Sequence, residues 1–324
     1  MVLPLSPADL PPEPWTGRFD GEGQEHRRWW QAVSPYSRGV PVPPGSAAEG
    51  QPGSRPAVML GFCSDEGVRR NKGRPGAALA PAALRAALGP LAFHLEREVF
   101  DAGDVVVSGG ALEDGQARAG QVITAMLDAG NLTAVLGGGH ETAYASYLGI
   151  AASAAVQGRR LGVLNLDAHF DLRDEPIPSS GTPFLQMAHA EAAAGRELRY
   201  AVVGISEPNN TRALFDTAQR LGVEYVLDED CTAARVESFV AGFLAGVDVL
   251  YLTIDLDVLP ASVAPGVSAP AAYGVPLPVI SAVCRQVAQS GKLLHFDVAE
   301  LNPAFDIDGR TARVAARLVD TLLR

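Results

Sequence analysis

Cysteine, long apolar runs and excess positive charge are all scarce in this sequence. Its three cysteines, Cys63, Cys231 and Cys284, are odd in number and show no metal-ligand spacing, so we expect them to be small, buried apolar residues. No apolar run approaches the roughly 18 to 20 residues that a membrane span requires. The formal net charge of −11 argues against nucleic acid or an anionic membrane as the main partner. A small-molecule substrate is therefore the expected partner.

The start of the chain, Met-Val-Leu-Pro-Leu-Ser-Pro, lacks the basic and apolar regions of a signal peptide, so a cytoplasmic location is expected. Residues 1–54 are rich in proline, glycine and charge, and predict a partly extended N-terminal arm rather than a domain. This arm is expected to pack through its aromatic residues onto the main body or a neighbouring subunit, with extended chain at 41–53; the aromatic residues are Trp15, Trp29, Trp30 and Tyr36.

Residues 55–324 predict a single α/β catalytic domain. Short apolar runs, expected as strands near 56–63, 98–102, 132–137, 161–168, 199–205, 223–227, 247–258 and 292–299, alternate with expected helices near 77–88, 115–129, 141–154, 183–195, 209–221, 233–245, 276–290 and 310–323. This alternation predicts a mostly parallel sheet with helices on both faces. In such sheets ligands bind beyond the carboxyl ends of the strands.

Three short strings at expected strand ends carry potential metal ligands. They are Gly-Gly-Gly-His-Glu, Asp-Ala-His-Phe-Asp and Thr-Ile-Asp-Leu-Asp, and their ligands are His140, Asp167, His169, Asp171, Asp255 and Asp257. Side chains at i and i+2 of a strand share one face, which would pair Asp255 with Asp257 and bring Asp167 beside His169. Asp171 lies just past the strand, where the backbone can curl it back.

Four clustered carboxylates repel one another unless a cation or protons neutralise them. The six candidate ligands include no sulfur atom, and carboxylates outnumber imidazoles among them. This ligand set favours hard divalent ions such as Mn²⁺ over structural zinc. A water molecule between two such ions loses a proton near neutral pH and becomes a nucleophile. The three strings together therefore predict a hydrolytic two-metal site.

Taken singly, the strings have other interpretations. A glycine turn after a strand also suits a non-enzymatic nucleotide- or phosphate-binding α/β protein, although the Walker lysine pattern and a full Gly-x-Gly-x-x-Gly fingerprint are absent. Asp255 at a strand end is equally consistent with capping the next helix.

The three strings, in this order, resemble the ureohydrolase family of arginases, agmatinases and formimidoylglutamases over roughly residues 55–324. The resemblance implies a three-layer α/β/α fold and two Mn²⁺ ions per subunit. It implies that the first ion is held by His140 and Asp171, the second by His169 and Asp257, and both by the bridging residues Asp167 and Asp255. Glu300, in Phe-Asp-Val-Ala-Glu-Leu-Asn-Pro, matches a family glutamate that contacts the cationic amidine or guanidine of the substrate. Asp171 is the residue expected to accept the proton of the attacking water.

Departures within the family point to the substrate. Phe184 stands where arginases and agmatinases have a histidine, the first string is Gly-Gly-Gly-His-Glu rather than Gly-Gly-Asp-His-Ser, and Arg173 follows the second string. These features resemble formimidoylglutamase, which implies hydrolysis of N-formimidoyl-L-glutamate to L-glutamate and formamide in histidine catabolism. The alternative is a guanidine-hydrolysing ureohydrolase of the guanidinobutyrase, agmatinase or arginase type.

A glutamate-derived substrate brings two carboxylates, which need cationic or amide donors at the pocket rim. The candidate donors are Arg69, Arg70, Asn71, Arg74, Arg173 and Asn210. Each arginine could equally pair with a nearby acidic residue, and Asn210 could belong to a helix cap. We also expect the chain to form a homo-oligomer.

Overall fold

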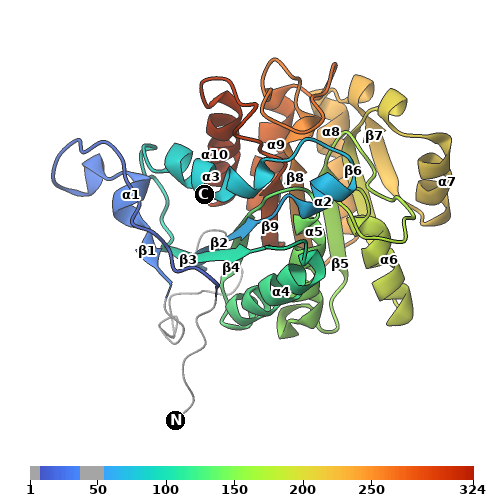
Figure 1. Cartoon of the computed structure of the whole chain (residues 1–324), viewed down its shortest axis with the longest axis horizontal. Coiled ribbons are helices and arrows are strands. Elements are labelled where there is room, and N and C mark those ends of the chain that lie inside the picture. Colours follow the sequence, from blue (N-terminus) through green and yellow to red (C-terminus); the bar gives the residue numbers. More distant parts are fainter. Residues whose placement is uncertain (1–7, 37–54) are drawn as a thin grey trace, which may run out of the picture.

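Nine parallel strands form one sheet in the computed structural model, which describes residues 8–36 and 55–324 (Figure 1). The strand order is β1-β3-β2-β4-β9-β8-β5-β6-β7, and every neighbouring pair is parallel. The strands are β1 (Ser34–Pro35), β2 (Ala57–Cys63), β3 (Val99–Val106), β4 (Leu132–Leu136), β5 (Leu161–Leu166), β6 (Arg199–Ile205), β7 (Glu224–Leu227), β8 (Val249–Asp255) and β9 (Leu293–Ala299).

Helices cover both faces of this sheet, because successive side chains of each strand point to opposite faces. In β8, Leu250 and Leu252 pack into one apolar core while Val249 and Tyr251 pack into the other. The first core is covered by α3 (Ala80–Leu88), α8 (Ala233–Ala245), α9 (Leu277–Gln289) and α10 (Arg310–Leu322). The second is covered by α4 (Leu112–Asp128), α5 (Thr142–Ala152), α6 (Pro183–Ala193) and α7 (Arg212–Arg220). The expected three-layer α/β/α fold is confirmed.

The N-terminal residues that the structure describes pack against the sheet through their aromatic side chains, as expected. Trp29, at the start of α1 (Trp29–Ala32), is fully buried and stacks with Trp15, and the Trp15 indole donates a hydrogen bond of 2.8 Å to Asp101 on β3. Tyr36 meets Phe100 edge to face. Strand β1 joins the sheet beside β3, which was not expected. The extended chain expected at 41–53 lies outside the described residues, and the boundary at residue 54 stays a prediction.

Cys231 and Cys284 are buried, but Cys63 is partly exposed because it is the last residue of β2, so the prediction for Cys63 was wrong. Within the described ranges, no helix combines the length and the apolar character needed to cross a membrane.

The carboxyl ends of four neighbouring strands position the predicted site. Strands β4, β9, β8 and β5 are consecutive in the middle of the sheet. His140 follows β4, Glu300 follows β9, Asp255 ends β8, and Asp167 follows β5. Segments far apart in the sequence therefore meet at one edge of the sheet.

Candidate active site

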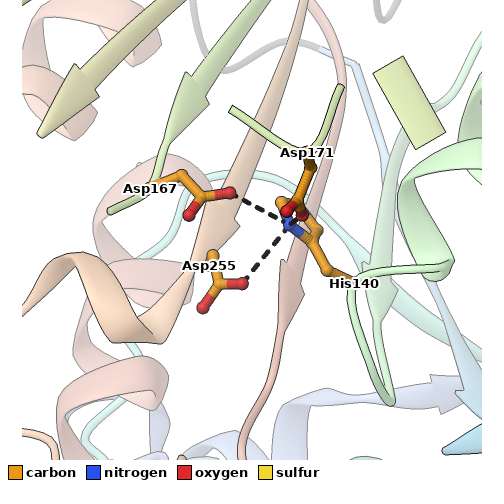
Figure 2. A group of neighbouring side chains, drawn as sticks. All are labelled: His140, Asp167, Asp171 and Asp255. Carbon is orange, nitrogen blue, oxygen red and sulfur yellow. Dashed lines mark hydrogen bonds and ion pairs between the residues drawn. The ribbon is translucent and has the colours of Figure 1, made fainter. Parts of the chain in front are cut away.

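The first group of potential metal ligands surrounds His140 (Figure 2). Its Nδ1 atom lies 2.9 Å from an oxygen of Asp171, 3.1 Å from Asp167 and 3.3 Å from Asp255. His140 is buried, and the four residues converge from three different strand ends. Nδ1 carries at most one proton and can donate a hydrogen bond to only one of these oxygens. The other oxygens therefore lie close to Nδ1 without receiving a hydrogen bond from it.

The second group consists of Asp167, His169 and Asp257. Nδ1 of His169 lies 3.0 Å from Asp257 and 3.5 Å from Asp167. Asp167 therefore contributes an oxygen to both groups, whereas Asp255 contributes only to the first. The family resemblance implied that both of these aspartates bridge, and the side-chain geometry shows this sharing for Asp167 alone.

The spacing within the strings comes from local turns and not from strand alternation. Strand β5 ends at Leu166 and β8 ends at Asp255, so the expected i, i+2 strand pairs do not form. Instead, Asp167 accepts the backbone N–H of His169 at 2.7 Å, and Asp255 accepts that of Asp257 at 2.8 Å. An aspartate that binds the N–H two residues on closes a tight turn, which explains the shared Asp-x-ligand pattern.

Asp171 and Glu300 reach the site through unusual backbone conformations. Asp171 has φ of 49° and Glu300 has φ of 68°, in the left-handed region that non-glycine residues rarely adopt. The predicted curl of the chain at Asp171 is thus present. Such conformations cost energy and persist where the surrounding structure enforces them, which is common at functional sites.

The donor set fits divalent cations. Even with both imidazoles protonated, four carboxylates and two imidazoles leave an excess of negative charge in a buried space. Burial, followed by repulsion from Asp257 and Asp167, raises the pKa of Asp255 well above its ordinary value. Burial and the charge of Asp167 also raise the pKa of Asp171. Two divalent ions would remove this penalty, because each carboxylate could then stay ionised.

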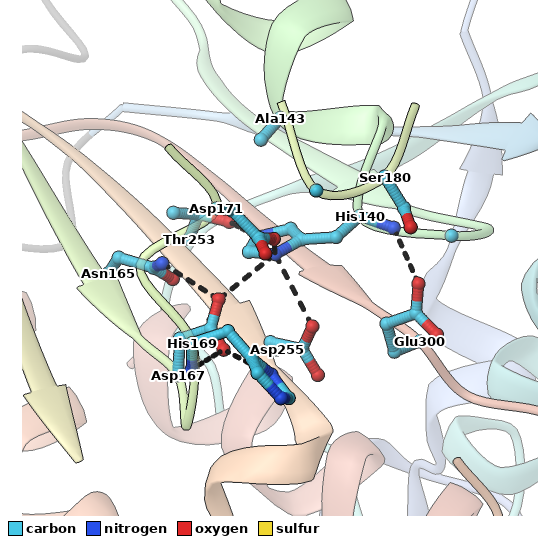
Figure 3. Close-up of polar contacts among 12 residues, drawn as sticks. His140, Ala143, Asn165, Asp167, His169, Asp171, Ser180, Thr253, Asp255 and Glu300 are labelled. Carbon is cyan, nitrogen blue, oxygen red and sulfur yellow. Dashed lines mark hydrogen bonds and ion pairs between the residues drawn. The ribbon is translucent and has the colours of Figure 1, made fainter. Parts of the chain in front are cut away.

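Glu300 lies beside the first group, where its Oε1 accepts the backbone N–H of His140 at 2.8 Å (Figure 3). Burial, followed by repulsion from Glu141, raises the pKa of Glu300 to about 8. A positively charged ligand beside Glu300 would stabilise its ionised form.

Arg173 and Asn71 line the same pocket as these carboxylates. Asn71 donates a hydrogen bond of 3.1 Å to the Ser180 hydroxyl. Arg173 is half-buried, and its guanidinium has no hydrogen bond or ion pair with any residue that the structure describes. Its side chain crosses Gly181 so closely that a Cβ there would lie 2.7 Å from Cδ of Arg173. The lining of the pocket thus contains an unpaired guanidinium together with the carboxylate cluster.

The other arginine candidates have protein partners. Arg69 and Arg70 lie outside the pocket lining and both pair with Glu66, at 2.5 and 2.9 Å. Arg70 also pairs with Glu113. Their placement favours the alternative of pairing with acidic neighbours. Arg74 does line the pocket, but its guanidinium donates to backbone carbonyls and lies over the Phe305 ring at 3.9 Å, which leaves little of it for a ligand.

Asn210 is buried and holds the chain behind the site. Its amide oxygen accepts the N–H of Phe170 at 3.1 Å, and its Nδ2 donates to the carbonyls of Ala168 and Ser206 at 2.9 Å. These bonds fix the segment that carries His169. Asn210 does not line the pocket, so its position supports a structural role.

The glycine loop after β4 is not arranged as a phosphate cradle. The N–H groups of Gly137, Gly139 and His140 donate to Val298, Ser64 and Glu300 respectively, and so are already engaged. A Cβ on Gly138 would overlap the carbonyl oxygen of Ser64. The glycines allow close packing of this loop against the chain after β2, which weighs against the nucleotide- or phosphate-binding alternative.

Phe184, which replaces the histidine of arginases and agmatinases, is fully buried. Its ring stacks on Tyr200 with centroids 4.4 Å apart and meets the His140 ring edge to face. This position therefore supports the imidazole through packing and offers no group that transfers protons.

Sequence reasoning missed three buried polar residues that support the ligands, two of which, Asn165 and Thr253, are labelled in Figure 3. Asn165 donates to Asp167 at 2.9 Å, and Thr253 contacts the His140 ring at 3.0 Å and donates to Asp297 at 2.6 Å. Each stands inside an apolar strand, where a polar side chain needs a partner. A polar residue inside an otherwise apolar strand was therefore the feature of the sequence that could have indicated these supporting residues.

Comparison with known proteins matches residues 55–324 to the description "Arginase family". The chain is 57% identical over 310 residues to a protein of Nocardia farcinica named formimidoylglutamase, covering 95% of each. It is 56% identical over 318 residues to a formimidoylglutamase of Rhodococcus opacus, covering 97% of this chain and 96% of the relative.

Solved structures share this fold. Formimidoylglutamase from Bacillus subtilis has a TM-score of 0.77 at 21% identity, covering 90% of this chain and 89% of that one, and so supports the fold. Formiminoglutamase from Trypanosoma cruzi, solved with Mn²⁺, has a TM-score of 0.73 at 26% identity, covering 84% and 94%. On the match over residues 55–324 and the identity to these relatives, the chain belongs to the arginase family.

Proposed function

We propose that this protein is a metal-dependent hydrolase that cleaves N-formimidoyl-L-glutamate to L-glutamate and formamide, a step of histidine catabolism. The names of relatives at 56–57% identity support this substrate. Water adds to the formimidoyl carbon, the bond from that carbon to the glutamate nitrogen breaks, and the nitrogen leaves with a proton as the amine of glutamate.

Two Mn²⁺ ions are the proposed cofactors. The first would be held by His140 and Asp171, the second by His169 and Asp257, with Asp167 and Asp255 shared between them. The two side-chain groups fit these roles except for Asp255, which lies in the first group alone, and the Mn²⁺ in the Trypanosoma cruzi structure supports the identity of the metal. When bound, such ions supply an activated water as nucleophile.

The remaining groups of the pocket would position the substrate and move protons. The Glu300 carboxylate would pair with the cationic formimidoyl nitrogens, as a carboxylate does with a planar cation. Asp171, whose carboxylate lies 2.9 Å from His140, would accept a proton from the attacking water and return it to the leaving nitrogen.

The observation that most supports a glutamate-derived substrate is the unpaired guanidinium of Arg173. A half-buried cation without a protein partner in the described part of the chain suits a ligand carboxylate, which it can bind with two parallel hydrogen bonds. Asn71 and Ser180, at the same rim, add an amide and a hydroxyl. A guanidine such as agmatine, which has no carboxylate, would leave Arg173 unpaired.

A side-by-side substrate assay tests the proposal. The Mn²⁺-loaded protein is assayed for glutamate and formamide release from N-formimidoyl-L-glutamate, and for urea release from arginine, agmatine and guanidinobutyrate. We expect kcat/KM for formimidoylglutamate to exceed that for every guanidine by at least about 100-fold, because formimidoylglutamate brings two carboxylates to the rim, arginine and guanidinobutyrate bring one, and agmatine brings none.

The matched control is Asp255→Asn, which keeps the size of the side chain but removes a charged ligand. It should lose nearly all activity in parallel preparations, which excludes a contaminating enzyme. Faster urea release from any guanidine would replace the proposed substrate with that of a guanidine hydrolase.

A further inference from the structure

We propose that Asp297, acting through Thr253, sets the tautomer and orientation of His140 so that Nδ1 offers its lone pair to the first metal ion. Asp297 and Thr253 are then positioning residues of the metal centre. This inference rests on the metal-dependent function proposed above.

Asp297 lies inside β9, fully buried, and it accepts hydrogen bonds from three hydroxyl groups. Ser146 and Tyr251 donate to its Oδ2 at 2.6 and 2.5 Å, and Thr253 donates to its Oδ1 at 2.6 Å. Burial raises the pKa of Asp297, and these three donors oppose the rise by stabilising the ionised form. The donors come from α5 and β8, so the carboxylate joins three elements behind the pocket.

The hydroxyl of Thr253 transmits this arrangement to His140. A hydroxyl has a single proton, and Thr253 uses it toward Asp297. The Thr253 oxygen also lies 3.0 Å from Nε2 of His140, where it can only accept. His140 must therefore carry its proton on Nε2.

The opposite nitrogen of His140 is thereby left as a lone pair in the neutral ring. Nδ1 faces the oxygens of Asp167, Asp171 and Asp255 within 3.3 Å, and a lone pair directed at carboxylates is repulsive. A divalent cation between them converts this repulsion into coordination. The outer hydrogen bond of a ligating histidine commonly fixes its tautomer and ring orientation in this way.

The adjacent His295 does not take over this role. Its Nε2 lies 3.9 Å from Asp297, beyond hydrogen-bond distance, while its Nδ1 contacts Thr133 at 2.6 Å. Among the described residues, hydroxyl groups are thus the side-chain donors to Asp297. The Asp297–Thr253 pair is the connection between this buried network and the pocket.

Metal-binding titrations test the inference on the full chain. Mn²⁺ stoichiometry and affinity are measured for the unsubstituted protein and for Thr253→Val, which keeps the shape but removes the hydroxyl. We expect the first ion to bind about 10- to 100-fold more weakly in Thr253→Val, with the second ion retained. Thr253→Ser should restore the unsubstituted affinities because it keeps the hydroxyl. Ser146→Ala, which removes a different donor to Asp297, should retain both ions.

Unchanged affinities for both ions in Thr253→Val would overturn the inference. Binding of two ions by the unsubstituted protein together with this result would reject the positioning role alone, whereas no binding by the unsubstituted protein would reject the proposed metal centre.

A measurement on the unsubstituted protein covers the case in which Thr253→Val does not fold. In ¹⁵N-histidine-labelled protein loaded with diamagnetic Zn²⁺, the ring proton of His140 should be found on Nε2. A proton on Nδ1 would contradict the proposal.

Discussion

At the scale of single residues, Arg173 distinguishes this pocket from a bare metal site. The six potential ligands account for hydrolysis, and they would be equally compatible with a guanidine substrate. Arg173 adds a cation that the described protein leaves unpaired beside Asn71 and Ser180. The choice of substrate therefore depends on the rim, where charge complementarity to the glutamate carboxylates is available.

Replacement of Arg173 by methionine should weaken substrate binding specifically. Arg173→Met removes the charge and keeps most of the side-chain volume, so KM for formimidoylglutamate should rise about 10- to 100-fold, since a hydrogen bond to a charged group contributes roughly 1.5–3 kcal/mol. Steady-state kinetics measure this effect. Arg69→Met is the matched control, because Arg69 is largely exposed and pairs with Glu66. Equal KM values for Arg173→Met and the unsubstituted protein would show that Arg173 does not bind the substrate.

The residues of the site differed in how far they could be predicted from sequence. His140, Asp167, His169, Asp171, Asp255 and Asp257 stand in dense strings, and the structure brings them together as expected. The roles of the rim arginines depend on distances across the fold: Arg70 meets Glu113, 43 positions away. The network of Thr253 and Asp297 joins neighbouring strands and leaves only isolated polar residues in the sequence.

At the scale of secondary-structure elements, Glu141 holds the short helix α2 (Glu66–Arg70) against the site. Its buried Oε1 accepts the Ser64 hydroxyl at 2.7 Å and the Gly67 N–H at 2.9 Å. The rim residue Asn71 directly follows α2. Glu141 therefore connects the glycine loop that carries His140 to the segment that carries part of the rim.

Removal of this connection should loosen the rim. Glu141→Ala leaves the Ser64 hydroxyl and the Gly67 N–H without their acceptor, at roughly 1–3 kcal/mol each, so hydrogen exchange of residues 64–74 should accelerate and KM should rise by at least about tenfold. Hydrogen–deuterium exchange and kinetics report the two effects. Glu113→Ala, which removes a more exposed contact of Arg70, is the control and should change both only slightly. Unchanged exchange across 64–74 in Glu141→Ala would contradict this role.

Long elements were predictable and short ones were not. The eight expected strands and eight expected helices are present, although β3 continues to Val106 and α4 begins at Leu112. Strand β1 and helices α1 and α2 were missed, because two to five residues are too few to display a hydrophobic period. The turns at Asp167 and Asp255 were mistaken for strand because the apolar pattern continues into them.

At the scale of the whole molecule, the fold explains why the site lies where it does. Four neighbouring parallel strands deliver their carboxyl ends to one edge, and each contributes part of the pocket. Buried carboxylates concentrated there would destabilise the protein without compensating cations. The metal centre and the arginase-family fold are thus parts of one arrangement, in which the sheet supplies the ligands and the connecting loops supply the rim.

A crystal structure of the Mn²⁺-loaded protein with L-glutamate bound, recorded with anomalous scattering at the manganese edge, tests this account most directly. We predict two anomalous peaks, one at His140 and Asp171 and one at His169 and Asp257, with a glutamate carboxylate on the Arg173 guanidinium. The absence of manganese at these residues, or glutamate bound away from Arg173, would contradict the account.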